Sequence, residues 1–481
     1  MWITTTSAGF DSKSGVSPYS ELLSNYVDAV GHASTMPYYS TGFIQCKDRY
    51  RNQSQVLDVA RGYIERQLPI STIVIDWMHW VAQGDWHFNP ICWPDPQGMV
   101  DELRTMGIET MVTFWPFQST GSRHWEEFSS KGYLVNQINA TEPTSYDGGD
   151  QYLVDETNPE VRSVVFDKYW EGYGTYGIKT VWIDAAEPEH NGGSKEGTWK
   201  MSKGTDAEVG EAWIQQHAKT FADGFATKGI EPSEYFILPR HAWSGSWRYS
   251  AALWSGDIES TFTELAIQIK VLQGVMMSGP ALWTTDIGGY HGGTPADPVF
   301  QELIVRWFQF GAFCPLFRLH GHRGGVHPPS NECGGTNGDN EVWNLAKEPS
   351  HYAAITNMMR LREELREYVS QINLEAANSG MPMVRPMFLQ WPLDPVAQTA
   401  EVEDQYMFGP DWLVGPVYTH GATSRSIYLP PLPANKTWVY YFNYSEVGSA
   451  GGHFEMDTPI TEFPLFFIRP VMPHALGKSA L

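Results

Sequence analysis

Carboxylates at the ends of apolar segments are the first groups in this sequence that could perform chemistry. Asp76, Asp184, Asp257 and Asp286 each follow a run rich in Val, Ile, Leu or Trp, and Glu187 lies three residues beyond Asp184. A pair of carboxyl groups can cleave a glycosidic bond when one acts as nucleophile or base and the other as proton donor. The pattern indicates a site of sugar hydrolysis, while a structural hydrogen-bonding role is the alternative for any single aspartate.

Further polar and aromatic side chains stand at comparable positions. Trp115, Arg240 and His320 also lie at the ends of apolar segments. If these segments are parallel strands of a barrel, their carboxyl ends share one rim, and active sites of that fold lie at this rim. The chain also contains 20 Trp, 23 Tyr and 23 Phe, whose flat faces suit sugar rings. We therefore expect these side chains to surround one carbohydrate-binding site.

Two other kinds of chemistry fit the sequence less well. The run RLHGHR offers His320 and His322 as metal ligands, but Arg318 and Arg323 beside them carry charges that oppose a cation. A nucleophilic serine is also disfavoured, because no G-x-S-x-G turn is present. We expect neither a metal nor an organic cofactor.

Composition and charge exclude several partners. The 481 residues include 32 Lys+Arg and 55 Asp+Glu, so the net charge of −23 argues against nucleic acid or an anionic membrane as partner. No apolar run is long enough to cross a bilayer, and the first twenty residues lack the apolar stretch of a signal peptide. The compartment and the oligomeric state stay undetermined. The four cysteines, Cys46, Cys92, Cys314 and Cys333, are far apart and predict neither a disulfide framework nor a zinc site.

The apolar segments predict the elements that would carry these residues. Eight segments alternate with stretches of helical periodicity, which is typical of an α/β fold, the (β/α)₈ TIM barrel. A doubly wound open sheet is the rival, but no Gly-rich phosphate fingerprint follows the first segment. The predicted strands are 38–43, 72–77, 110–116, 179–185, 235–240, 252–257, 281–289 and 314–320.

The chain divides into three parts. Residues 1–35 precede the barrel, the barrel is expected over 36–365, and 351–380 reads as its closing helix. From residue 383 short β-like runs separated by Gly, Pro and Asn predict a small all-β sandwich over 383–475. Long loops at 119–150 and 321–344 are expected to shape the binding site.

Several motifs resemble a known family. The runs IVIDWMHWVAQGDWHFNP, VWIDAAEPE, PRHAWSGSWRYSAALWSGDI, TTDIGGY, CPLFRLHGHR and QYMFGPDWLVGPV occur in the order seen in glycoside hydrolase family 31. The resemblance extends from about residue 36 to 470, and the wording is most similar to the α-xylosidase branch of the family. Members of that family are retaining α-glycosidases built on a TIM barrel.

The resemblance implies roles for individual residues. Asp184 would attack the anomeric carbon as the nucleophile, and Asp257 would act as acid and base, in a double displacement that releases terminal α-linked xylose or glucose. Glu187 would support the loop of Asp184. The residues expected to bind the sugar's hydroxyls or to wall its subsite are Asp76, Trp115, Arg240, Trp254, Asp286 and His320.

The sequence departs from the family pattern and leaves alternatives open. Members usually have a large β-sandwich before the barrel, whereas only about 35 residues precede it here, of which 18–31 resemble the connecting helix. A catalytically inactive carbohydrate-binding protein or fragment is therefore one alternative, and transglycosylase or α-glucan lyase chemistry is another. Trp77 and Met78, directly after Asp76, are bulky enough to block the space near C6 and favour xylose, unless they point into the barrel wall.

Overall fold

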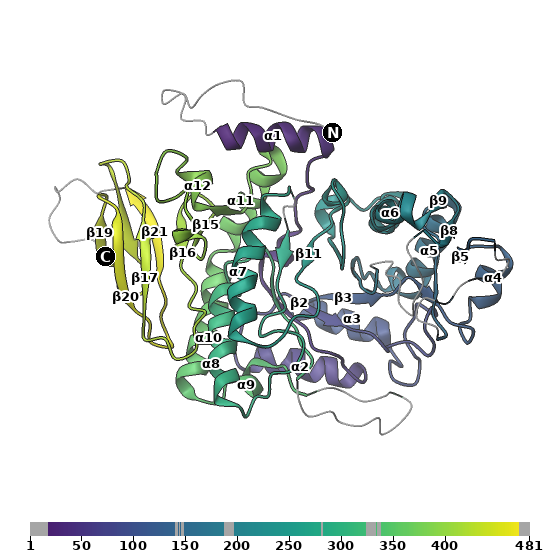
Figure 1. Ribbon diagram of the computed structural model, residues 1–481. Coiled ribbons are helices and arrows are strands. Elements are labelled where there is room, and N and C mark those ends of the chain that lie inside the picture. Colours follow the sequence, from purple (N-terminus) through teal and green to yellow (C-terminus); the bar gives the residue numbers. More distant parts are fainter. Residues whose placement is uncertain are drawn as a thin grey trace.

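The computed structural model describes residues 18–139, 143, 145, 149–186, 197–279, 282–323, 333 and 338–470. They form a parallel β/α barrel followed by an antiparallel β unit (Figure 1). In Figure 1 the yellow C-terminal strands lie on one side of the green helices α7 (Phe262–Met276), α8 (Pro298–Gly311) and α10 (Pro349–Glu364). The blue and teal insertions that follow β3 (Glu109–Phe114) and β7 (Thr180–Ile183) lie on the other side. Both ends of the predicted loops 119–150 and 321–344 are described, but parts of their interiors lie outside the described residues.

Eight short parallel strands form the barrel. Six of them pair in the order β10-β7-β3-β2-β1-β13, and β11 pairs with β12. Parallel bridges from Ile237 to Ala251 and from Ile287 to Leu319 join this pair to both edges of the larger sheet, so the ring closes. The strands are β1 (Phe43–Gln45), β2 (Thr72–Ile75), β3 (Glu109–Phe114), β7 (Thr180–Ile183), β10 (Ile237–Pro239), β11 (Leu253–Trp254), β12 (Trp283–Thr284) and β13 (Phe317–Leu319).

The composition of these strands explains their position. Runs such as TIVI in β2 and TVWI in β7 are buried at every residue, as expected for a parallel sheet that is covered on both faces. The first predicted strand, 38–43, is wrong over most of its length, because Tyr38–Thr41 forms a 3₁₀ turn (η1) and the strand begins at Phe43. Pro37 precedes that turn and supplies no backbone N–H for pairing.

Helices separate most of these strands. Side chains of Asn52, Asp95, Asn158, Thr261 and Asp297 cap five of the helices by accepting backbone N–H groups of the first turn. The predicted closing helix is two helices that meet at Leu365. The barrel helices are α2 (Gln53–Glu65), α3 (Pro96–Thr105), α5 (Pro159–Gly172), α6 (Asp206–Thr227), α7 (Phe262–Met276), α8 (Pro298–Gly311), α10 (Pro349–Glu364) and α11 (Arg366–Ser379).

Shorter elements complete this part of the chain. The expected connecting helix is present as α1 (Pro18–Val30), and α9 (Val342–Leu345) precedes α10. The insertions after β3 and β7 hold α4 (Trp125–Ser130), β4 (Phe117–Gln118), β5 (Asn136–Gln137), β6 (Tyr152–Leu153), β8 (Trp199–Met201) and β9 (Gly204–Thr205). The 3₁₀ turns η2, η4 and η5 are Gly174–Tyr176, Pro232–Glu234 and Ser246–Tyr249.

One disulfide bond corrects the prediction drawn from cysteine spacing. Cys92, between β2 and α3, is bonded to Cys333, in the segment after β13. The two residues are 241 positions apart, and only the barrel brings them together, because β1 pairs with both β2 and β13. Cys46 and Cys314 are buried free thiols.

The C-terminal unit is an antiparallel β-sandwich. A six-stranded sheet, β14-β15-β16-β21-β18-β19, packs against the antiparallel two-stranded sheet β17-β20 through a core that includes Leu413, Ile427 and Trp438. The short α12 (Met387–Gln390) and η6 (Ala400–Val402) lie between its first strands. The strands are β14 (Val384–Pro386), β15 (Tyr406–Phe408), β16 (Trp412–Val414), β17 (Ser424–Leu429), β18 (Lys436–Tyr440), β19 (Glu446–Gly448), β20 (Gly452–Asp457) and β21 (Leu465–Pro470).

None of the described helices combines the length and the apolar character that crossing a bilayer demands.

Candidate active site

A cavity of about 270 Å³ lies at the carboxyl ends of the barrel strands. This volume is at the small end for ligand sites and suits a single small ring. Each of seven strands contributes to its wall, either from its last residues or from the loop that follows. The lining residues are Asp76, Trp77, Trp115, Trp182, Asp184, Ala185, Arg240, Asp257, Tyr290 and His320.

The two predicted catalytic carboxylates meet at one guanidinium. Arg240 Nη1 lies 3.4 Å from Asp184 Oδ1 and 3.0 Å from Asp257 Oδ2. These two oxygens are therefore at most about 6.4 Å apart, the sum of the two contacts. The side chain of Asp184 is 13% exposed and that of Asp257 is 35% exposed, so Asp257 is the more accessible of the pair.

The surroundings of Asp184 act on its pKa in opposite directions. Burial raises the pKa of Asp184, and the positive charge of Arg240 opposes that rise. The negative charge of Asp257 adds to the rise, so the pKa of Asp184 lies above its ordinary value. Arg240 is thus the main group that favours the ionised form of Asp184.

Aromatic rings form one wall of the cavity. Trp77 is stacked on Trp115, with ring centroids 5.3 Å apart and planes 7° apart. Trp182 is set edge-on to His320 at 5.1 Å. Such flat apolar faces can pack against the C–H face of a sugar, while the carboxylates and Arg240 can hydrogen-bond its hydroxyls.

Two predicted site residues lie behind this wall. Asp286 is fully buried and forms an ion pair with Arg318 at 2.5 Å. Burial raises the pKa of Asp286 to about 7 although Arg318 opposes the shift. Trp254 is buried and set edge-on to Trp182 at 5.5 Å. Neither residue lines the cavity: Asp286 contacts Arg318 behind it, and Trp254 packs against the lining residue Trp182.

The other six predicted residues all line the cavity, and the sequence missed three further lining residues, Trp182, Ala185 and Tyr290. Trp182 had a usable signal, because it precedes Asp184 by two residues, and alternate residues of a strand point to the same side. Trp77, which the sequence indicates as a residue that could block the space near C6, also lines the cavity. Tyr290 follows Gly288 and Gly289, both in the left-handed region with φ of 89° and 78°, so a loop rather than a strand places it. Glu187 lies outside the described residues.

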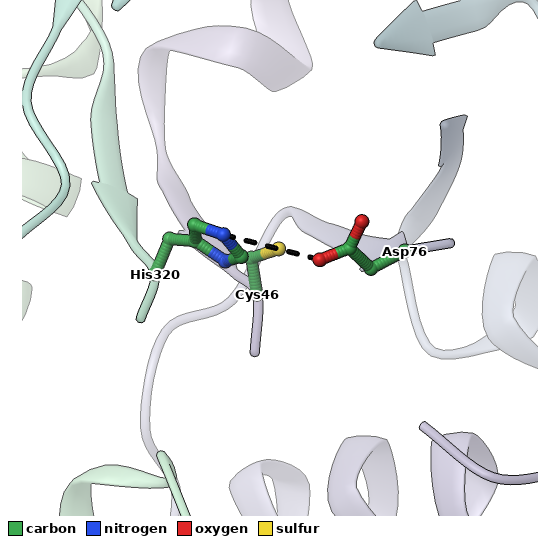
Figure 2. Close-up of side chains that lie close together, drawn as sticks. All are labelled: Cys46, Asp76 and His320. Atoms are coloured by element: carbon green, nitrogen blue, oxygen red, sulfur yellow. Dashed lines mark ion pairs between the residues drawn. The ribbon is translucent and has the colours of Figure 1, made fainter. Parts of the chain in front are cut away.

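Three buried side chains near the cavity have the geometry of a metal site. Ligand atoms of Cys46, Asp76 and His320 lie within 4.8 Å of one another, and Figure 2 shows them converging. The sequence offers His320 and His322 as a pair of metal ligands, but in this cluster the partners of His320 are Cys46 and Asp76.

The charges around this cluster disfavour a cation. Arg318 Nη2 is 3.9 Å from Cys46 Sγ, so a positive charge already lies at this position. Burial raises the pKa of Cys46 well above its usual range, which opposes the thiolate that metal ligation requires. Burial, Arg318 and Arg323 hold the pKa of His320 well below its ordinary value. The nearby positive charges and the protonated thiol of Cys46 therefore make these three residues a poor metal site, although the neutral imidazole of His320 is itself a form that can bind a metal.

Two family profiles and several glycosidases are similar to this chain in sequence. The profile of the Glycosyl hydrolases family 31 TIM-barrel domain matches residues 33–371, and that of the Glycosyl hydrolase family 31 C-terminal domain matches residues 380–470. An uncharacterized family 31 glucosidase from Pseudescherichia vulneris is 40% identical over 303 residues, which cover 63% of this chain and 57% of that protein. An alpha-xylosidase from Saccharolobus solfataricus is 28% identical over 466 residues, which cover 95% of this chain and 58% of that protein.

A solved structure shares the fold as well. The crystal structure of a family 31 alpha-xylosidase from a soil metagenome, complexed with xylose, superimposes with a TM-score of 0.88 at 39% sequence identity. The match covers 93% of this chain and 66% of that one. The chain therefore spans between 57% and 66% of the length of these three proteins.

Proposed function

The chain belongs to glycoside hydrolase family 31, and on that basis we propose that it is a retaining α-glycosidase that removes terminal α-linked xylose or glucose. The proposal concerns the barrel and the C-terminal sandwich, for which we keep the boundaries 36–365 and 383–475. In it Asp184 is the nucleophile and Asp257 is the acid and base. Asp76, Trp115, Arg240 and His320 bind the sugar ring, and Trp254 and Asp286 support them from behind.

The contact of both carboxylates with Arg240 is the observation that supports this proposal most. Retaining enzymes hold their two carboxyl groups about 5–5.5 Å apart, whereas inverting enzymes separate them by about 6.5–9.5 Å to admit a water molecule. The limit of about 6.4 Å between the two oxygens that face Arg240 is compatible with the retaining arrangement.

The exposure of the two carboxylates is consistent with their proposed roles. Asp184 is the more buried of the two and lies against Arg240, as suits an ionised nucleophile that meets only the anomeric carbon. Asp257 is the more exposed, as suits a group that must reach first the leaving oxygen and then a water molecule. In the second step this water attacks the glycosyl–Asp184 ester, Asp257 takes its proton, and the Asp184 carboxylate leaves.

Xylose is the substrate that we favour over glucose. Trp77 lines the cavity directly beside Asp76, and in this proposal its indole takes up the space of a hydroxymethyl substituent. Met78 is 47% exposed and is absent from the cavity lining, so only Trp77 narrows the cavity in this way. The similarity to a structure solved with xylose supports the same choice.

Hydrolysis of aryl α-xyloside and aryl α-glucoside, followed by NMR of the first-formed anomer, tests the mechanism. We expect the α-anomer first and the higher kcat/KM on the xyloside. Asp184→Ala should lose activity. Asp257→Ala should lose about 10²- to 10⁴-fold on a poor leaving group and less on an activated aryl group. An Asp58→Ala variant, which changes an exposed carboxylate on α2, serves as the control.

Added azide separates the roles of the two carboxylates. Azide should attack the glycosyl enzyme formed by Asp257→Ala and give the α-glycosyl azide. In Asp184→Ala it should enter from the vacated side, displace the aryl group and give the β-glycosyl azide. An inverted first product from the wild type, or wild-type rates in Asp184→Ala, would show that the proposed mechanism is wrong. Tight sugar binding without turnover would favour an inactive binding protein instead.

A further inference from the structure

Asp48 is a buried carboxylate behind the cavity that the mechanism above does not use. It lies three residues after β1 and is 2% exposed. Its Oδ1 accepts a hydrogen bond from Trp77 Nε1 at 2.6 Å, and its Oδ2 accepts one from the Tyr290 hydroxyl at 3.5 Å. Trp77 and Tyr290 both line the cavity, whereas Asp48 does not. One carboxylate thus connects wall residues that follow two different strands, β2 and β12.

The Trp77 ring is held from several directions. Its plane lies on Trp115, and the guanidinium of Arg49 lies 4.8 Å from its ring centre. These contacts hold the plane of the ring but do not distinguish its two edges, because a half turn about the Cβ–Cγ bond keeps the plane and exchanges them. The short bond from Nε1 to Asp48 removes this freedom, because it fixes which edge of the indole faces inward.

Trp77 is also coupled to a proposed sugar-binding group. The backbone N–H of Trp77 donates to Asp76 Oδ1 at 2.7 Å. After burial, the negative charge of Asp48 is the largest contribution to the raised pKa of Asp76. A change at Asp48 can therefore act through the position of the indole or through charge, and a test must separate the two.

We propose that Asp48 is a positioning residue that locks the Trp77 indole and the Tyr290 ring into the cavity wall and thereby selects a pentose over a hexose. This inference rests on the proposed glycosidase function. The two hydrogen bonds of Asp48 control the space beside Asp76. In this proposal the hydroxymethyl group that distinguishes glucose from xylose would lie in that space. Loss of the hydrogen bonds to Asp48 lets the indole turn. The fit to xylose then becomes looser, and glucose can enter the cavity.

Substitution of Asp48 by alanine and by asparagine separates position from charge. Asp48→Ala removes the acceptor, so we expect KM for aryl α-xyloside to rise about tenfold, with kcat changed less than about threefold. The xyloside-to-glucoside ratio of kcat/KM should fall about tenfold. Asp48→Asn keeps an acceptor oxygen without the charge and should restore that ratio to within about twofold of the wild type.

A matched control exists in the C-terminal unit. Asp394 is a buried carboxylate that accepts from the Tyr428 hydroxyl at 2.6 Å, so Asp394→Ala removes a comparable bond far along the chain from the site. The xyloside-to-glucoside ratio of kcat/KM in Asp394→Ala should equal that of the wild type. If Asp48→Ala does not fold, Trp77→Phe replaces it, because this variant keeps an aromatic ring while it removes the donor of the bond together with part of the bulk of the indole. An unchanged ratio in Trp77→Phe would then overturn the proposal.

The indole N–H resonance of Trp77 gives a readout that does not depend on activity. In protein labelled with ¹⁵N-tryptophan, the signal lost in Trp77→Phe identifies this residue. That signal should move upfield in Asp48→Ala, where its acceptor is gone, and stay near its place in Asp48→Asn. An unmoved signal together with an unchanged ratio overturns the role of Asp48. Failure of the wild type to hydrolyse either glycoside would overturn the proposed function, while the resonance would still decide whether Asp48 holds the indole.

Discussion

Replacement of Arg240 by methionine should move the pH dependence of the reaction. Arg240 is the largest influence that lowers the pKa of Asp184, which burial otherwise raises. Without this charge a larger fraction of Asp184 is protonated at a given pH, and a protonated carboxyl group cannot attack the anomeric carbon. The acid limb of the plot of kcat/KM against pH should therefore move to higher pH.

The contact distance sets how far the acid limb should move. Two unit charges about 3.4 Å apart interact by about 5 kcal/mol at an effective dielectric constant of about 20, which limits the displacement to about 3.6 pH units. The side chain of Arg240 is 22% exposed, so solvent weakens the interaction. We expect the limb to move by about 1 to 3 pH units, as is usual for a carboxylate beside an arginine. At a fixed pH well below the midpoint, kcat/KM should fall about tenfold for each pH unit that the limb moves.

The assay is hydrolysis of aryl α-xyloside between pH 4 and 9 under kcat/KM conditions. Arg240→Lys keeps the charge and should move the limb less than Arg240→Met, although both variants can bind the sugar more weakly. Arg162→Met is the control, because Arg162 is half-buried and donates to the Glu156 carbonyl away from the cavity. If Arg240→Met lowers the rate at all pH values and leaves the acid limb in place, Arg240 does not hold Asp184 ionised.

Three further predictions concern stability. Burial lowers the pKa of His79 to about 3. As the pH falls from about 6.5 towards 3, the unfolded state binds a proton that the native state does not, so the free energy of unfolding should drop by about 1.4 kcal/mol per pH unit. Urea unfolding at several pH values should show a smaller drop per pH unit in His79→Gln, and an equal drop would contradict this. Removal of the disulfide in Cys92→Ala/Cys333→Ala should cost about 2 to 4 kcal/mol in the same measurement, and the addition of reductant should then change nothing. Arg362, which is fully buried, donates to four backbone carbonyls, so Arg362→Met should lose at least about 3 kcal/mol, and a thermal midpoint equal to that of the wild type would refute this role.

Much of the barrel could be predicted from the sequence because its strands are buried on both faces. Continuous apolar runs such as TIVI and TVWI distinguish such strands from helices of longer period, and each predicted segment from 72–77 onward overlaps a strand. The first segment misled because Tyr38 and Tyr39 favour strands in general, whereas Pro37 and the 3₁₀ turn delay the strand to Phe43. The break at Leu365 within the last predicted helix had no comparable signal.

The sequence alone determined which residues gather at one end of the barrel. Parallel strands present their carboxyl ends at one rim, so a polar residue at a strand end is assigned to that rim without knowledge of its neighbours. Six of the eight predicted site residues line the cavity for this reason.

Only the tertiary structure decided which way each side chain points and which distant group it meets. Asp286 stands at a strand end like Asp257, yet its carboxylate turns to the buried Arg318 rather than into the cavity. The contact of Arg240 with both carboxylates, the bond from Trp77 to Asp48 and the disulfide between Cys92 and Cys333 join parts of the chain that lie far apart in sequence. Such pairings depend on the closure of the barrel, because strand order and the conformation of each loop place the partners. The spacing of residues along the sequence predicts neither of these.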